Sequence, residues 1–421
     1  MGLKIIHTAD WHLGQTFFGY DRQTEHTAFL HWLTNTITLT KADVLFIAGD
    51  VFDVANPSAA AQRQFFRFLK EINQSNPGLQ VVVIAGNHDS AARLEAPNPL
   101  LEELNTSVTG VVKRTDQGEI DFDSLLLPLR NREGSVQAWC MAVPFLRQGD
   151  YPPTDDKENN TYVAGVDRMY QQLFNHARDK KEPGQPVVAM GHLHVMGAEL
   201  SDDDRSERVI MGGLEAVTSN TFHPALAYTA LGHIHKAQRV GGRENIRYSG
   251  SPLPMSFSET NYRHQVVMVE LDGDNPARIE PILIPQTIEL IRVPKVPAIP
   301  EEVIAALSEL PDKPLLEDEA HLAPFLEVRV LLTEPAPGFR NQVEEAIAGK
   351  FVRLTSIIPS YPRREHGGEE VALSFHDLQK IDPLDMVKRT YENKYANELP
   401  ESIEKLFREV VQELNVKQEA Q

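Results

Sequence analysis

The sequence contains a single cysteine, Cys140, among its 421 residues. One thiol excludes an internal disulfide and any metal cluster that is held by several cysteines. The 15 histidines and 60 acidic residues remain as side chains that can bind a metal ion. Any metal site in this protein is therefore expected to consist of imidazole and carboxylate ligands.

Long apolar runs are also missing from the sequence. No run approaches the roughly 20 apolar residues that cross a bilayer as a helix. Residues 1–7 do not begin a charged segment followed by an apolar stretch, which is the pattern of a secretion signal. These two absences predict a cytoplasmic protein that does not insert into a membrane.

Positive charge is scarce: the sequence has 41 lysine and arginine residues against 60 aspartate and glutamate residues, which gives a formal net charge of −19. Proteins that coat nucleic acid by bulk electrostatics need lysine and arginine to neutralise phosphates. The composition disfavours that class of protein. An enzyme that acts on nucleic acid remains compatible with it if divalent metal ions supply positive charge, or if a separate subunit holds the nucleic acid.

The pattern of the first half predicts an α/β fold, because short apolar runs alternate with helix-period segments. A helix that begins at Pro57 would place Phe65, Leu69 and Ile72 on one face. Turn-punctuated segments between residues 110 and 144 predict antiparallel strands, so the sheets should be mixed. Five apolar runs are predicted to be buried strands: residues 4–8, 44–48, 79–85, 186–190 and 227–231.

The length exceeds the roughly 250–300 residues at which a single core stops growing, so more than one domain is expected. We predict a large domain at residues 1–280, a small α/β domain at 281–368 and a helical segment at 369–421. The small domain should begin with a proline-rich, linker-like stretch and continue as strand, helix and strand, at residues 325–332, 341–348 and 351–359. Residues 147–161 are predicted to form a surface loop without an assigned function.

Polar residues of one chemical kind follow each of the five predicted strands. The carboxyl ends of parallel strands meet at one edge of an α/β sheet, where ligands bind, so these side chains should converge on one site. They are Asp10 and His12 (ADWHLG), Asp50 (GDVFD), Asn87 and His88 (GNHD), His192 and His194 (GHLH), and His233 and His235 (GHIH).

The residue types at these strand ends favour a pair of divalent metal ions. Carboxylate and imidazole without thiolate suit manganese, zinc or iron. One cation needs three or four ligands, so this larger set of candidates is better explained by two cations bridged by a carboxylate. Asp50 is the natural bridge because it alone occupies its strand end. Such a pair orients water for in-line attack on phosphorus, so hydrolysis of a phosphate ester is the expected reaction.

The order D-x-H, GD, GNHD, GH and GHxH resembles the motif order of the calcineurin-like metallophosphoesterases, which fold as a sandwich of mixed β-sheets flanked by helices. Four segments also resemble the family of SbcD nuclease subunits of bacterial SbcCD complexes. They are residues 7–14 (HTADWHLG), 49–53 (GDVFD), 232–235 (GHIH) and 248–257 (YSGSPLPMSF). The small domain, in the role of a cap, and the terminal helices fit that family by their order only.

The resemblance implies a role for each matching position. One metal ion would be held by Asp10, His12, Asp50 and His235, and the other by Asp50, Asn87, His192 and His233, with Mn²⁺ the expected metal. His88 would contact the scissile phosphate without binding metal and would assist the leaving group. Asp89 is expected to orient His88 by accepting the hydrogen of its other ring nitrogen. His194 is not expected to bind metal, because the family pattern asks only for the first histidine of GHLH.

The resemblance also implies an activity and partners. It implies a two-metal DNA nuclease with ATP-assisted endonuclease and 3′-to-5′ exonuclease activity on DNA ends and hairpins, in DNA repair, recombination and replication. The partner would be the coiled-coil ATPase SbcC, bound by the C-terminal helices, in a heterotetramer that contains a homodimer of this chain. A partner that carries much of the DNA affinity would also account for the acidic net charge. Alternatively, the terminal helices pack on their own domain.

Three other functions are compatible with parts of the pattern. A phosphoprotein phosphatase usually carries an arginine after the second motif (GDxxDRG), whereas residues 49–54 read GDVFDV. A cyclic-nucleotide phosphodiesterase would need neither the small domain nor the tail. A metal-free interaction module on a decayed core should have lost ligands, whereas all seven predicted ligands are present.

Overall fold

The computed structural model describes residues 2–154, 161–199, 216–314, 321–361, 383–395, 398–401 and 403–408. It divides into two compact units, Met1–Thr287 and Ile288–Gln421. Within the described ranges, no helix is both long enough and apolar enough to span a bilayer. The predicted domain boundaries at residues 280 and 368 stay predictions, and residue 368 lies outside the described ranges.

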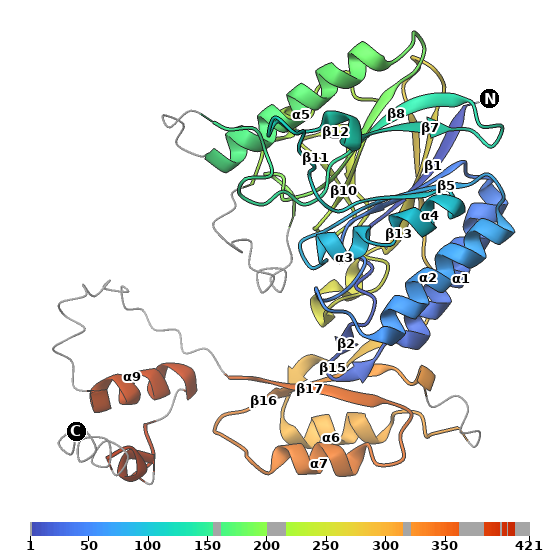
Figure 1. The fold of residues 1–421 in the computed structure, drawn as a ribbon. Coiled ribbons are helices and arrows are strands. Elements are labelled where there is room, and N and C mark those ends of the chain that lie inside the picture. Colours follow the sequence, from blue (N-terminus) through green and yellow to red (C-terminus); the bar gives the residue numbers. More distant parts are fainter. Residues whose placement is uncertain are drawn as a thin grey trace. The chain divides into compact units, whose positions relative to one another are not determined.

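The first unit contains two six-stranded sheets of mixed direction (Figure 1). One sheet has the order β14-β13-β1-β4-β5-β6, with the bounds β1 Leu3–Thr8, β4 Val44–Ala48, β5 Gln80–Ile84, β6 Thr106–Thr109, β13 Gln265–Leu271 and β14 Arg278–Leu283. The other has the order β11-β12-β10-β9-β8-β7, with the bounds β7 Leu126–Arg130, β8 Val136–Ala142, β9 Val187–His192, β10 Tyr228–Gly232, β11 Gln238–Val240 and β12 Arg243–Tyr248. Strands β1, β4, β5 and β6 run parallel, as do β8, β9, β10 and β12.

The inner faces of the two sheets form one apolar core. Val44 and Phe46 from β4 belong to the same buried cluster as Val188 and Met190 from β9 and Ala230 from β10. Burying an aliphatic or aromatic side chain of this size contributes roughly 1.5–3 kcal/mol relative to leaving it in water. This core therefore holds the two sheets, and the ends of their strands, at a fixed separation.

Helices cover the outer face of each sheet, with α5 on one side of the sandwich and α1 and α2 on the other (Figure 1). Their bounds are α1 Gln23–Thr40, α2 Ala59–Ser75, α3 Ala91–Glu95, α4 Asn98–Leu101 and α5 Thr161–Lys180. Short elements complete the unit: the strands β2 Thr16–Phe17 and β3 Tyr20–Asp21, and the 3₁₀ helices η1 Glu102–Leu104, η2 Phe122–Leu125, η3 Ser219–Thr221 and η4 Phe257–Asn261.

Helix α2 begins two residues later than the prediction from Pro57. Ser58 has an extended backbone, and its side chain accepts a hydrogen bond from the Ala61 N–H, so Ser58 is the N-cap of the helix. The predicted face is correct, because Phe65, Leu69 and Ile72 are all buried.

The predicted α/β fold of mixed sheets flanked by helices is confirmed. All five predicted strands form, and their bounds differ from the predictions by at most two residues. Strands β7 and β8 pair antiparallel, as the turn-punctuated segment predicted, and β8 then pairs parallel with β9. The largest difference is at β9, which continues through His192 because Gly191 and His192 keep pairing with β10.

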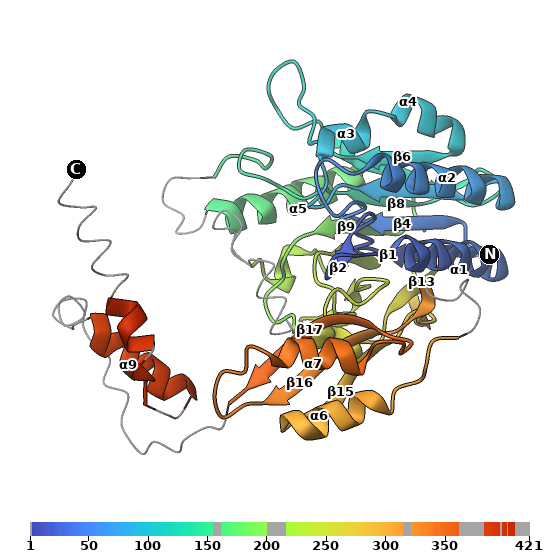
Figure 2. The ribbon, with the colours of Figure 1, turned by 90° about the horizontal axis from the view of Figure 1, so that it is seen from below.

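The second unit contains a parallel three-stranded sheet, β15-β16-β17, with α6 and α7 on one face (Figure 2). The bounds are β15 Leu290–Ala298, α6 Pro300–Ser308, β16 Phe325–Leu331, α7 Phe339–Ala346 and β17 Arg353–Ser360. Its core joins Val303 and Leu307 of α6 to Val328 of β16 and Val343 of α7.

The prediction of a linker at the start of this unit was wrong. The proline-rich stretch forms the edge strand β15 and the helix α6. Proline lacks a backbone N–H, and an edge strand tolerates it because only one side of the strand must pair. The ladder with β16 is interrupted between Val293 and Ala298, where Pro294 and Pro297 lie, and Pro300 opens α6.

The tail contains helix α9, Pro383–Tyr395, and residues 403–408 are also helical. Lys388 Nζ lies 2.9 Å from a carboxylate oxygen of Glu404, so an ion pair joins these two helical segments. Apart from residues 398–401, the remaining residues of the helical segment predicted at 369–421 lie outside the described ranges. Residues 155–160 of the surface loop predicted at 147–161 lie outside them as well.

Candidate metal centre

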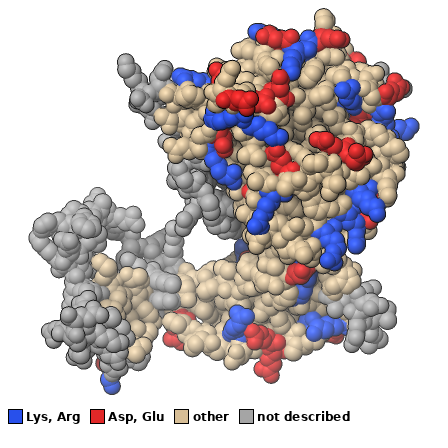
Figure 3. Space-filling view, in the orientation of Figure 1, with Lys and Arg blue, Asp and Glu red and all other residues tan. Residues whose placement is uncertain are grey.

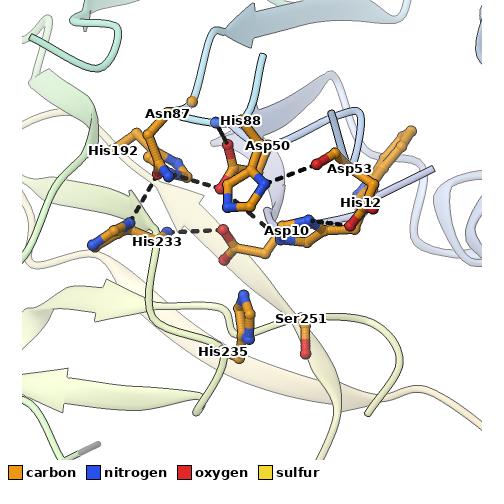
Figure 4. Close-up of polar contacts among 12 residues, drawn as sticks. Asp10, His12, Asp50, Asp53, Asn87, His88, His192, His233, His235 and Ser251 are labelled. Carbon is orange, nitrogen blue, oxygen red and sulfur yellow. Dashed lines mark hydrogen bonds and ion pairs between the residues drawn. The ribbon is translucent and has the colours of Figure 1, made fainter. Parts of the chain in front are cut away.

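The strand ends of both sheets bring the predicted residues together in one buried cluster (Figure 4). Asp10 follows β1, Asp50 follows β4, and Asn87 follows β5, whereas His192 ends β9 and His233 follows β10. The side chains of Asp10, Asp50, His192 and His235 are each at most 3% exposed. The predicted convergence is therefore present in the structure, and it draws on both sheets of the sandwich.

Tight local backbone geometry makes this convergence possible. Asp10, His12, Asp50 and His233 all have positive φ angles, of 56°, 46°, 50° and 100°. Such conformations cost of order 1–3 kcal/mol for non-glycine residues and are concentrated at functional sites. Gly86 supplies close approach instead, because a Cβ atom there would overlap the backbone N and the Oδ1 atom of Asp50.

Asp50 occupies the middle of the cluster. Its Oδ2 atom lies 3.1 Å from His192 Nε2 and 3.9 Å from His12 Nε2. Its Oδ1 atom accepts a hydrogen bond of 2.8 Å from the backbone N–H of His88. The carboxylate thus faces residues from three strand ends, as a bridging group would.

Three groups of side chains have the composition and spacing of metal sites, and two of them consist entirely of predicted ligands. Asp10, His12 and His235 form one group, and Asp10, Asp50 and His192 form the other; within each group the ligand atoms lie within 4.8 Å of one another. Asp10 Oδ2 is buried and has no hydrogen-bond partner among the described residues, which is the state of an acceptor that faces a cation. The donor set therefore fits divalent metal ions.

Asn87 connects one further histidine, His233, to the group that contains His192. Its Oδ1 atom lies 2.9 Å from His192 Nε2 and 3.0 Å from His233 Nδ1. The other ring nitrogen of His192 lies 2.9 Å from the backbone oxygen of Ala48, so Nδ1 carries the hydrogen and donates it. Nε2 is therefore the ring nitrogen of His192 that faces Asn87 and Asp50.

The acidic and imidazole groups of the cluster shift one another's pKa values. Burial raises the pKa of Asp10. Burial alone would raise the pKa of Asp50 too, but the charges of His192 and His12 and a hydrogen bond from His192 hold it well below its usual value. Burial alone would lower the pKa of His192, yet the charge of Asp50 and their hydrogen bond raise it to about 9. Asp50 and His192 therefore form an ion pair, in which the proton on His192 Nε2 faces the carboxylate of Asp50.

The predicted contact between Asp89 and His88 is wrong. Asp89 accepts hydrogen bonds from three backbone N–H groups, those of Val51, Phe52 and Gly86, at 2.9–3.2 Å. His88 Nδ1 instead donates to the backbone oxygen of Asp53, 2.8 Å away. The buried carboxylate of Asp89 accepts several backbone N–H groups at once and therefore fixes the turns after β4 and β5. The carbonyl of Asp53 orients His88.

Two carboxylates beside the cluster were not predicted. Asp53 Oδ1 lies 3.3 Å from His12 Nδ1, and Glu259 Oε1 lies 3.4 Å from His235 Nδ1. Asp53 could have been found as the last residue of GDVFD, three positions after Asp50. Glu259 carries no such signal, since only the fold brings η4 to His235. His194 belongs to none of the candidate metal groups within the described ranges.

Comparison with known proteins agrees with this geometry. A model described as calcineurin-like phosphoesterase matches residues 3–237, more than half of the chain. The chain belongs to this family and is a metal-dependent hydrolase of that class.

Curated relatives define the branch more closely. Proteins named as the SbcD subunit of the nuclease SbcCD match this chain at 38% identity in Rhodobacter capsulatus (86% of this chain and 88% of that protein), 35% in Escherichia coli K12 (68% and 69%) and 29% in Bacillus subtilis 168 (89% and 97%). The chain is a member of the SbcD family. A model described as Type 5 capsule protein repressor C-terminal domain matches residues 286–395.

Proposed function

We propose that this chain is the two-metal nuclease subunit of a complex with an SbcC ATPase, and that it hydrolyses phosphodiester bonds at DNA ends and hairpins. Both endonuclease and 3′-to-5′ exonuclease activity are expected, in DNA repair and recombination. The observation that carries the proposal is the position of Asp50, a buried carboxylate between ligand-type side chains of both sheets. Membership of the SbcD family supports DNA as the substrate.

The residues divide into two ligand sets that share Asp50. One metal ion would be held by Asp10, His12, Asp50 and His235, and the other by Asp50, Asn87, His192 and His233. Bound divalent cations, for which we propose Mn²⁺, supply Lewis acidity: they polarise the phosphoryl oxygens and favour deprotonation of an attacking water. The protein's part is to fix these ligands before substrate arrives, through the turns and the hydrogen bonds described above.

His88 is positioned to act on the leaving group. Its ring lies next to that of His12, with 4.9 Å between the centroids, and is half-buried, so it borders the cluster and remains accessible. Nδ1 keeps its hydrogen in the bond to the Asp53 carbonyl, so the acid is the imidazolium form of His88, whose Nε2 carries the proton that passes to the departing sugar oxygen. We therefore propose His88 as the general acid, and the Asp53 carbonyl, in place of Asp89, as the group that orients it.

The surface charge supports a separate DNA-holding partner. On the face of the first unit in Figure 3, lysine and arginine are interspersed with aspartate and glutamate. Exposed cations such as Lys180 and Arg239 are also paired with carboxylates, those of Asp123 and Glu244. The described residues of this face thus form no continuous basic track for a phosphate backbone. We propose that SbcC supplies much of the DNA affinity and binds the C-terminal helices, within a heterotetramer that contains two copies of this chain.

The test uses the full chain co-expressed with the SbcC protein of the same organism. With Mn²⁺ and ATP, the complex should cleave a DNA hairpin, and chelation of the metal should abolish cleavage. Cyclic nucleotides and phosphoserine peptides serve as competing substrates. Failure on hairpin DNA in the presence of the partner, or faster hydrolysis of a cyclic nucleotide, would reject a DNA nuclease in favour of a small-molecule phosphodiesterase.

A further inference from the structure

The imidazoles of His12, His192 and His235 have different partners at Nδ1. His192 Nδ1 donates to a neutral backbone oxygen. His12 and His235 instead have a carboxylate beside Nδ1, from Asp53 at 3.3 Å and from Glu259 at 3.4 Å. The two imidazoles of the Asp10, His12 and His235 group therefore each have a carboxylate at Nδ1, whereas His192 has a carbonyl oxygen there.

Glu259 is held rigidly in this place. It lies in η4, its side chain is 2% exposed, and its Oε2 atom accepts a hydrogen bond of 2.8 Å from the backbone N–H of Met255. One oxygen is thus occupied by its own loop, and the other faces His235. A buried carboxylate is stable only when its oxygens have hydrogen-bond or ion-pair partners, so the contact with the imidazole has an energetic reason.

The loop before η4 is fixed independently of the metal cluster. The fully buried guanidinium of Arg22 donates to the backbone oxygen of Pro254 at 2.7 Å and pairs with Glu25 at 2.7 Å. The Ser251 N–H also donates to the backbone oxygen of His235. The loop that carries Glu259 is therefore held in place by contacts outside the metal cluster, and these contacts fix the carboxylate of Glu259 beside His235.

We propose that Glu259 is a positioning residue of the metal centre: its carboxylate accepts the Nδ1 hydrogen of His235, which leaves Nε2 unprotonated for a metal ion and fixes the plane of the ring. A carboxylate in this position also raises the basicity of the ligating nitrogen. The inference deepens the proposed two-metal function, on which it rests, by assigning unequal support to the two sites.

The test is the variant Glu259→Gln, which keeps the size of the side chain. Its amide oxygen can still accept the Met255 N–H, but its NH₂ group then faces His235 Nδ1 and favours the tautomer with hydrogen on Nε2. Mn²⁺ binding is measured on the full chain without DNA, by calorimetry and equilibrium dialysis. We expect one of two bound ions to lose about 10- to 100-fold in affinity and the other to change by less than about threefold.

The matched control is Glu25→Gln, because Glu25 is a buried carboxylate that supports the same loop through Arg22 and contacts no histidine of the centre. It should lower thermal stability and leave both Mn²⁺ affinities nearly unchanged. If it weakens Mn²⁺ as much as Glu259→Gln does, loop integrity explains the effect and the proposal is wrong. Wild-type affinity for both ions in Glu259→Gln would also overturn it.

Glu259→Asp covers the case in which the glutamine variant does not fold. It keeps the charge but shortens the side chain, so its affinity for the weakened ion should lie between those of wild type and a variant without the carboxylate, Glu259→Ala. An aspartate variant no better than the alanine variant would contradict the role of the charge. Wild-type chain that binds two ions but leaves hairpin DNA intact rejects the nuclease proposal alone, whereas wild type that binds no ion rejects both.

Discussion

At the scale of single residues, the two oxygens of Asp50 have separate partners. Oδ1 accepts the N–H of His88, and Oδ2 faces His192. The hydrogen bond from the His88 N–H thus holds Asp50, the proposed bridging ligand, against the backbone of His88, the proposed general acid. A change in the side chain of His88 leaves the backbone N–H, and hence the position of Asp50, in place.

We therefore expect His88→Ala to separate catalysis from metal binding. Loss of a general acid lowers the rate by about 100- to 10,000-fold, whereas Mn²⁺ affinity should change by less than about threefold. Cleavage of hairpin DNA by the complex and calorimetry of Mn²⁺ binding measure the two effects. If the variant also loses a metal ion, His88 is a ligand, together with His12 and Asp53, with which it forms a third candidate group.

The ion pair between His192 and Asp50 predicts how metal binding depends on pH. The pKa of His192 is raised to about 9, since the charge of Asp50 outweighs the effect of burial. Below that pH the imidazole carries a proton that a metal ion must displace, so affinity at this site should rise with pH, by up to about tenfold per unit. Competition with a chelator from about pH 6.5 to 8.5 measures this. A flat profile, or tighter binding at lower pH, would contradict the assignment of His192 as a ligand.

At the scale of elements, α2 depends on its cap. Ser58→Ala removes the hydrogen bond to the Ala61 N–H and should lower the free energy of unfolding by about 1 kcal/mol. Ser75→Ala is the control, because that hydroxyl donates to a backbone oxygen at the exposed end of the same helix. Urea denaturation of both variants measures the difference. Equal effects would show that the cap contributes nothing specific.

The sequence predicted those elements whose signals are local. Five apolar runs became strands, because runs this short that are apolar on both faces suit strands buried between two layers. The start of the second unit was mistaken for a linker, because prolines usually interrupt strands. They are tolerated here because β15 is an edge strand, which the sequence alone does not reveal. The ligand-type residues could be predicted from their positions after strands. The contact of Glu259 with His235 could not, since it depends on the path of a loop that has no pattern of its own.

At the scale of the whole molecule, the cluster joins the two sheets of the first unit. Asp10, Asp50 and Asn87 come from one sheet, and His192 and His233 from the other. Any cation bound by both sets acts as a cross-link between the sheets. Metal binding should therefore stabilise the first unit as a whole.

We expect Mn²⁺ at 100 times its dissociation constant to raise the free energy of unfolding by about 2.7 kcal/mol for each site, and a chelator to reverse the effect. Thermal denaturation with and without Mn²⁺ provides the measurement. Asp50→Asn should lose most of the increase, because it removes the shared ligand. The second unit is an internal control, since its described residues include no candidate metal group; an equal shift in its transition would indicate nonspecific binding.

The hydrogen bond from the His233 N–H to Asp10 joins residues 223 positions apart in the chain. This separation sets an order of events during synthesis. The first candidate ligand leaves the ribosome early, but a growing chain holds no complete pair of sites until His235 has emerged and the second sheet has docked on the first. A chain that stops before His233 and His235 therefore lacks part of both proposed ligand sets and should not bind two metal ions.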